Sequence, residues 1–161
     1  MDTGNIEGLR PEGTTRVNGK TMLEHIGGRT RLKDLVGHFH ASALADDLLG
    51  EMFRRGKPAH AAHLTAFLEE IMGGGKRYSV HHNGVRGLFE AHANLGITEE
   101  QRQRFVQLMM ASADAAGLPG DERFRRALRA RVEQGSMFSM TLSQPGAGPP
   151  VPWPPVGTWD W

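Results

Sequence analysis

Apolar side chains recur at intervals of three and four residues along most of the chain after residue 20. This interval marks one face of a helix, and no segment alternates between apolar and polar residues for long enough to predict a strand. The pattern therefore predicts an all-α fold. Long helices are expected at residues 29–45, 59–72, 98–117 and 120–142.

Shorter helices are expected between the long ones, at residues 46–53 and 84–92. Thr98 and Gln101 have the spacing of a capping box, which marks the start of one long helix. The stretch "KRYSVHHNG", residues 76–84, shows no helical periodicity and is expected to be a loop.

The composition divides the chain into three segments. Residues 1–20 are rich in Gly, Thr and charge, with few large apolar side chains, so a flexible N-terminal arm is expected. Residues 21–142 contain the helical pattern and form the expected domain. Residues 143–161 are rich in Pro and Trp, which predicts an extended tail that lays its tryptophans on the body of the domain.

Charge and composition narrow the functional classes. The 19 basic and 18 acidic residues nearly cancel. The net charge is therefore too small to produce an electrostatic field that would attract nucleic acid or a membrane surface. The absence of Cys excludes disulfides, thiolate metal sites and a Cys nucleophile. No run of the sequence predicts a signal peptide or a membrane span, and a soluble, cytoplasmic protein is expected.

Histidine is the residue type that points to chemistry. The chain has eight histidines, all of them within residues 25–92. His60 and His63 could share a helix face, yet a zinc site needs three or four converging ligands, and no HExxH pattern is present. Haem needs one axial histidine, an apolar slot and groups for its propionates. His92, just before a capped helix, is either such a ligand, a buried polar residue or a surface residue.

Five segments in order also carry a family resemblance: "HFHASALADD", "FLEEIMGGGKRYS", "HHNGVRGLFEAHANLGITEEQRQRFVQLM", "ADAAGLPGDERFRRAL" and "SQPGA". With them, residues 21–147 resemble the truncated haemoglobins, specifically their group II. The resemblance implies a globin-like, two-over-two helical sandwich for the globin domain at residues 21–142. It also implies haem b as the cofactor, with O₂, NO or CO as small ligands of its iron.

The resemblance assigns the proximal haem ligand to His92. Its Nε2 atom would bind the iron, while Nδ1–H donates to a backbone carbonyl and so fixes the ring.

The distal side departs from the usual group II pattern. Where group II members usually carry a Tyr and a Trp, this chain has His40 and Phe105. By resemblance, His60 is the distal helix residue, with Leu64 one turn later, and Phe53 packs on the haem face. His60 or His40 is therefore expected to donate a hydrogen bond to the bound gas, and His60 could instead coordinate the iron.

The remaining expected contacts surround the haem edge and faces. By resemblance, Tyr78 and Arg86 are the first candidates to bind the propionates, with Lys76 or Arg77 next, although these last two would also suit a solvated loop. The residues expected to fill the apolar slot are Phe67, Leu68, Phe89, Met109 and Phe138. The core of a haem-free helical protein would contain the same types of residue, so these residues do not by themselves indicate haem.

Three functional hypotheses follow. The first is a haem protein that reversibly binds O₂ and other diatomic gases, for transport or sensing, which the family does not distinguish. The second is a haem-dependent redox enzyme, a NO dioxygenase or a peroxidase-like protein, with a reductase as partner. The third is a haem-free helical module that binds metal or a partner. A monomer or weak homodimer is expected.

Overall fold

Eight helices make up the regular structure of residues 15–161, the part of the chain that the computed structural model describes. They are α1 (Met22–Ile26), α2 (Arg29–Ala45), α3 (Gly50–Arg54), α4 (His60–Ile71), α5 (Arg77–His81), α6 (Gly84–His92), α7 (Glu99–Ala115) and α8 (Glu122–Ser143). The all-α prediction is confirmed. None of these helices is long and apolar enough to cross a membrane.

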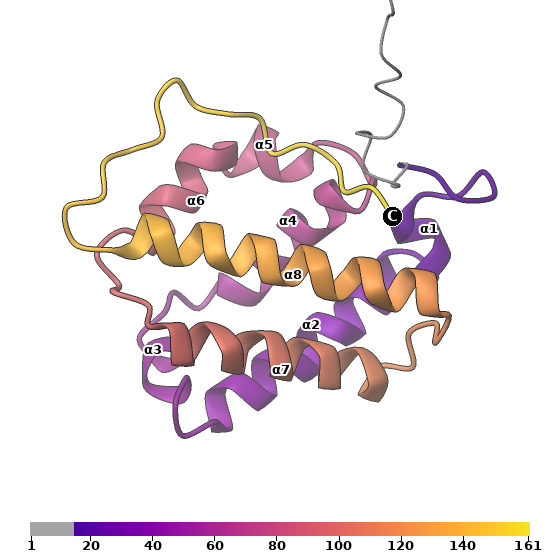
Figure 1. Ribbon diagram of the computed structural model, residues 1–161, viewed down its shortest axis with the longest axis horizontal. Helices are drawn as coiled ribbons and strands as arrows, with labels where there is room; N and C mark the ends of the chain where they lie inside the picture. The colour runs from indigo at the N-terminus through magenta and orange to yellow at the C-terminus, as the bar shows by residue number, and fades with distance from the viewer. Residues whose placement is uncertain (1–14) are drawn as a thin grey trace, which may run out of the picture.

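Two pairs of long helices form the body of the domain. Helix α2 packs against α4 and α7, and α7 packs in turn against α8. Figure 1 shows α7 and α8 side by side, with the short helices α5 and α6 beyond α8. Since α6 also packs against α8, the proximal-ligand candidate His92 is held at the edge of this sandwich.

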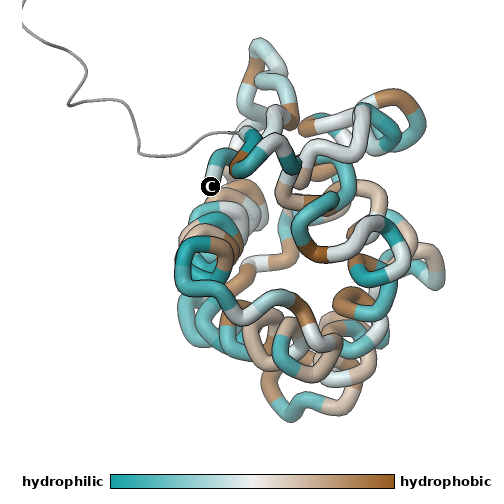
Figure 2. The backbone as a smooth tube through the Cα atoms, turned by 90° about the vertical axis from the view of Figure 1, so that its right-hand side faces the viewer, coloured by the Kyte–Doolittle hydropathy of each residue, from teal (hydrophilic) through white to brown (hydrophobic). Residues whose placement is uncertain are grey.

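The core is formed by the apolar helix faces that the sequence pattern predicts. Phe39 on α2 and Phe124 on α8 are both 0% exposed. The predicted inward face of α2 is entirely buried: Leu32, Leu35, Val36, Phe39 and Ala43. Each such large side chain stabilises the fold by about 1.5–3 kcal/mol on burial. Hydrophobic and hydrophilic colours alternate along the helical tubes in Figure 2, as this arrangement requires.

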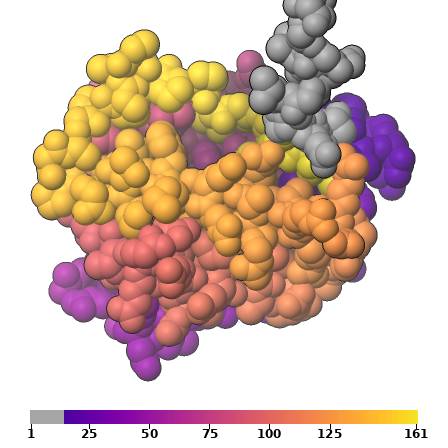
Figure 3. All heavy atoms as spheres, viewed as in Figure 1, coloured from indigo at the N-terminus to yellow at the C-terminus, as the bar shows by residue number. Residues whose placement is uncertain are grey.

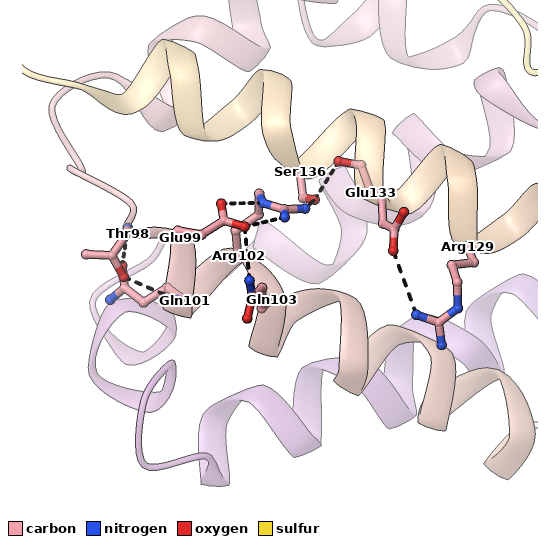
Figure 4. Close-up of polar contacts among 8 residues, drawn as sticks. All are labelled: Thr98, Glu99, Gln101, Arg102, Gln103, Arg129, Glu133 and Ser136. Carbon is pink, nitrogen blue, oxygen red and sulfur yellow. Dashed lines mark hydrogen bonds and ion pairs between the residues drawn. The ribbon is translucent and has the colours of Figure 1, made fainter.

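The start of α7 is fixed by the predicted capping box. Thr98 Oγ1 accepts from the backbone N–H of Gln101 at 3.1 Å, and Gln101 Oε1 accepts from the N–H of Thr98 at 2.9 Å (Figure 4). One residue further on, Arg102 pairs with Glu99 and donates to Ser136 Oγ of α8 at 3.4 Å. The same turn that begins α7 therefore also joins it to α8.

The stretch expected to be a loop contains the short helix α5, so that prediction is wrong. Contacts with α4 explain why a stretch without periodicity is helical. Ser79 donates its backbone N–H to Glu70 Oε1 at 2.9 Å, and its hydroxyl also donates to the Glu70 carboxylate. Tyr78 packs edge-on against Phe67, with ring centroids 5.3 Å apart.

Two further expectations differ from the structure. Helix α3 begins at Gly50 rather than residue 46, because the Asp46 carboxylate accepts from the N–H groups of Leu48 and Leu49 and forms a turn there. Phe138 is 38% exposed rather than buried. It follows the buried Val132 by six residues, which at 3.6 residues per turn places it about 240° around the helix.

The residues after α8 are non-helical and lie along the body of the protein, and we call residues 144–161 the strap. Figure 1 shows it passing α6 and α5 and finishing near α1. Trp161 is 4% exposed and belongs to the main core cluster, a deeper position than the expected surface contact. The boundary at residue 142 stays a prediction.

Only the last part of the predicted N-terminal arm can be compared with the structure. Residues 1–14 lie outside the described residues. In residues 15–20, Val17 and Lys20 form an isolated antiparallel bridge.

Candidate functional site

Three of the predicted pocket residues meet although they come from three different helices. The ring of His60, on α4, lies 5.3 Å from Phe53 of α3 at 88°, and 6.1 Å from His40 of α2. The His40 and Phe53 rings are 6.3 Å apart. We call His40, Phe53 and His60 the distal cluster.

The distal cluster is continuous with the core through Phe39. The Phe39 ring lies 5.8 Å from Phe53 and 4.9 Å from Phe105, edge-on in both cases. Phe105 lies on α7 and is half-buried. The position that carries Trp in group II members thus holds a smaller apolar ring without an N–H donor.

His60 is a neutral imidazole with an unsatisfied nitrogen. Its pKa is lowered to about 4, first by burial and then by the charges of His92, His40 and His63. Its Nδ1 atom is buried and has no hydrogen-bond partner among residues 15–161. A buried polar atom without a partner costs about 1–3 kcal/mol, so this ring is suited to a site where a ligand supplies the missing contact.

His92 is the last residue of α6, and its ring is oriented by its own helix. Nδ1 lies 2.7 Å from the carbonyl oxygen of Leu88, one turn earlier. Because a carbonyl only accepts, Nδ1 carries the proton and Nε2 keeps its lone pair. Burial lowers the pKa of His92, whereas the bond to Leu88 acts in the opposite direction. The ring is thus a neutral imidazole with Nε2 free to coordinate a metal.

Large apolar side chains lie around these histidines without being fully covered. Five of the residues predicted to contact haem are half-buried: Phe53, Leu64, Phe67, Phe89 and Phe105. Except for Phe89, each also packs against the buried core cluster. Such a set leaves apolar surface from four helices available to a flat, apolar group. The residues present therefore fit haem.

Tyr78 lies at the edge of this region, where α5 meets α6. It is 5% exposed, and burial, followed by the charge of Glu70, raises the pKa of its phenol. The approach of the two helices is close here, because a Cβ at Gly87 would lie 1.9 Å from the carbonyl oxygen of His82 and 3.5 Å from the Tyr78 hydroxyl. Tyr78 is thus a protonated hydroxyl in a fixed position.

Arg86 is the predicted site residue that the structure does not direct inward. It is exposed, and its Nε lies 3.1 Å from Glu90 Oε1 on the same helix. Sequence reasoning missed a different contact: the rings of His63 and His82 lie against each other at a tilt of 45°, with centroids 4.3 Å apart. No spacing in the sequence indicates this contact between two helices.

Other features of the described chain lie away from these histidines. Two surface grooves, of about 320 and 700 Å³, are lined by residues of α7 and α8. Of the residues predicted to surround the haem, only Phe138 lines one of these two grooves. Residues 15–161 contain no group of three or more His, Asp or Glu placed to hold a metal ion. Haem iron needs only one axial histidine from the protein.

The helical sandwich is similar to that of the globins. A profile of the bacterial-like globin family matches residues 21–134, and the chain belongs to that family. The match ends before the strap begins. No curated protein sequence matches the chain at a significant level.

Solved structures of similar fold are haemoglobins of bacteria. The haemoglobin of the thermophilic phototroph Chloroflexus aurantiacus has 27% identity and a TM-score of 0.67, over 75% of this chain and 98% of that one. The truncated oxygen-avid haemoglobin of Bacillus subtilis has 26% identity and a TM-score of 0.66, over 74% and 98%. The group II truncated haemoglobin of Bacillus anthracis, at 23% identity and a TM-score of 0.67, covers 75% and 90%. The predicted membership of the truncated haemoglobin family is confirmed.

Proposed function

We propose that this chain is a group II truncated haemoglobin that holds haem b through His92 and reversibly binds O₂, NO or CO beside His60 and His40. The observation that carries the proposal is the bond of His92 Nδ1 to Leu88, which leaves Nε2 as a metal ligand. Haem held by His92 would supply an iron centre able to bind a diatomic gas. The oxygen-avid haemoglobin of B. subtilis, with 26% identity, supports O₂ as the first ligand to test.

The proximal side depends on a ring that is both oriented and unprotonated. The Leu88 carbonyl holds the imidazole at one angle to α6. A metal ligand must be in its neutral form, and burial of His92 lowers its pKa in that direction. Protons therefore compete weakly with iron for Nε2 near neutral pH.

The distal side would contact the bound gas through imidazole rather than through phenol or indole. His60 is neutral, so one of its ring nitrogens is a donor and the other an acceptor. Its unpartnered Nδ1 supports a role facing the ligand. His40 lies 6.1 Å away, ring to ring, and is the second candidate donor.

Of the two groups proposed to bind the propionates, one is already engaged in an ion pair, which is Arg86 with Glu90. Tyr78 holds a protonated hydroxyl at the edge of the region, since burial raises its pKa. Arg86 would have to exchange its ion pair with Glu90 for one with a propionate. We therefore rank Tyr78 first. The haem faces are assigned to Phe53, Leu64, Phe67, Phe89 and Phe105.

Reconstitution of the full chain with hemin tests the proposal. We expect one hemin per chain, a Soret band in the ferric and ferrous forms, and a shifted band under CO. Failure to bind hemin stoichiometrically would contradict it. Turnover of peroxide with a reducing substrate, or of NO, would favour a peroxidase-like protein or a NO dioxygenase over oxygen transport.

Three expectations remain predictions from the sequence: a cytoplasmic location, a monomer or weak homodimer, and a reductase partner.

A further inference from the structure

The strap contacts the proximal helix at two points. The Trp153 ring packs on Phe89 of α6 with centroids 5.9 Å apart. Further along, Val156 lies over Gly84 at the start of α6, where an added Cβ would meet its Cγ2 at 3.7 Å. Figure 3 shows the strap, in yellow, covering the edge of the molecule beyond α8. The strap therefore lies along α6 from its C-terminal half to its first residue.

Beyond α6 the strap is anchored in the core. Trp159 donates its backbone N–H to the carbonyl of Ile71 at 2.6 Å. Arg131 pairs with Asp160, and Arg123 donates to the backbone oxygen of Trp161 at 2.7 Å. The Trp161 indole is buried.

The near end of the strap is fixed as well. Gln144 donates from Nε2 to the carbonyl of Ile97 at 2.9 Å, and Gly96 donates its N–H to the carbonyl of Ser143 at 2.8 Å. These bonds join the end of α8 to the loop that follows His92. A segment held at both ends can restrain what lies beneath it, which here is α6.

Helix α6 depends on such restraint. It has nine residues, too few to be stable alone, and only Gly84 and Val85 are buried. Phe89 lies next to Leu88, whose carbonyl orients His92, so Trp153 packs on the same turn that sets the imidazole. Movement of this turn would change the direction of Nε2.

We propose that the strap is a positioning element of the proximal side, in which Trp153 holds α6 through Phe89, keeps His92 aimed at the iron and slows the loss of haem. The proposal rests on the proposed function. The strap lies outside the family match, which ends at residue 134.

The first test uses the full chain without hemin. Trp153→Ala should raise the hydrogen-exchange rates of the α6 amides about two- to tenfold. This factor corresponds to the interaction free energy of one aromatic pair. Trp153→Phe should restore most of the protection. Val151→Ala is the matched control, because Val151 is a strap residue that is 63% exposed. Equal α6 exchange in Trp153→Ala and Val151→Ala would overturn the proposal that the strap holds α6.

The second test uses the same variants loaded with hemin. Trp153→Ala should transfer hemin to excess apomyoglobin about two- to tenfold faster than the wild type, and should shift or broaden the ferrous iron–histidine stretching band in resonance Raman spectra. Unchanged transfer and an unchanged band would overturn the positioning role while the haem assignment stands. A wild type that binds no hemin would overturn the proposed function and haem retention together, and α6 exchange would still decide whether the strap holds that helix.

Discussion

The imidazole rings of His40 and His60 lie 6.1 Å apart and are tilted by 33°, with Phe53 beside both of them. The Phe53 ring stands edge-on to His60 at 88° and at 62° to His40. One phenyl ring thus limits the rotation of two histidines from different helices. A ligand in the distal cluster would meet a pair of imidazoles in a restricted arrangement, rather than a single movable one.

His60→Leu should speed O₂ dissociation about five- to tenfold if His60 donates to the ligand, because one neutral hydrogen bond contributes about 1 kcal/mol. Stopped-flow release of O₂ from the ferrous protein measures this. His40→Phe is the control and should have a smaller effect on the rate.

The same His60→Leu variant separates donation from coordination. If His60 binds the iron, its loss should convert a six-coordinate, low-spin spectrum into a five-coordinate one and speed ligand association. No change in spectrum or O₂ kinetics for His60→Leu and His40→Phe alike would contradict the histidine-based distal side.

His92→Ala should abolish stable hemin binding, because no other residue is assigned to the proximal position. Free imidazole should restore the Soret band by filling the space that the side chain leaves. His81→Ala is the control, since His81 is exposed on the neighbouring helix α5. An unchanged hemin content in His92→Ala would remove His92 from the axial role.

Asp46→Asn should destabilise the fold by about 0.2–1 kcal/mol at pH 7, because it removes the charged partner of Arg104 while the Asn side-chain oxygen can still accept from the backbone. The Asp46 carboxylate accepts from the N–H groups of Leu48 and Leu49 and from Arg104 at 2.6 Å. Urea unfolding of the variant beside Asp47→Asn, an exposed neighbour, measures the difference.

The effect of Asp46 should depend on pH in a defined direction. Burial alone would raise the pKa of its carboxyl, but the bonds from Arg104, Leu49 and Leu48 outweigh burial and lower it. The ionised form thus stabilises the fold fully above the unfolded pKa of about 3.9 and loses this effect as pH falls through the lower folded pKa. The difference between wild type and Asp46→Asn should shrink only below about pH 4. Shrinkage between pH 5 and 7 would point to another group.

Removal of residues 145–161 should leave a folded helical domain of reduced stability.

Trp161→Ala alone should cost about 3–5 kcal/mol, as expected for a fully packed aromatic side chain. The total stability of a domain of this kind is about 5–15 kcal/mol. Trp153→Ala should cost less, because Trp153 is 37% exposed. Equal losses from the two substitutions, in thermal or urea unfolding, would contradict the buried position of Trp161.

Most of the helical framework could be predicted from periodicity alone. The bounds of α2 and α6 match the expected ranges, and those of α4, α7 and α8 agree within two residues at each end. These helices bury one face, so their apolar positions repeat with the helical period. Helix α5 could not be predicted in this way because it depends on Glu70 and Phe67 of another helix.

The site could be predicted in part. The bond from His92 Nδ1 to a carbonyl follows from helix geometry, since a residue at the end of a helix can reach the carbonyl one turn earlier. The axial role of His92 came from the family resemblance, because the residue alone left three alternatives open. The contact between His63 and His82 and the depth of Trp161 depend on packing between distant segments, which leaves no period in the sequence.

All three tryptophans of the chain, Trp153, Trp159 and Trp161, belong to the strap. Their intrinsic fluorescence therefore reports on the strap alone, whereas far-ultraviolet circular dichroism reports on the helices. Denaturation curves recorded with both signals should coincide if the strap leaves together with the body of the protein. A fluorescence transition at lower urea would define the strap as a separate cooperative unit, one that opens while the helices remain folded.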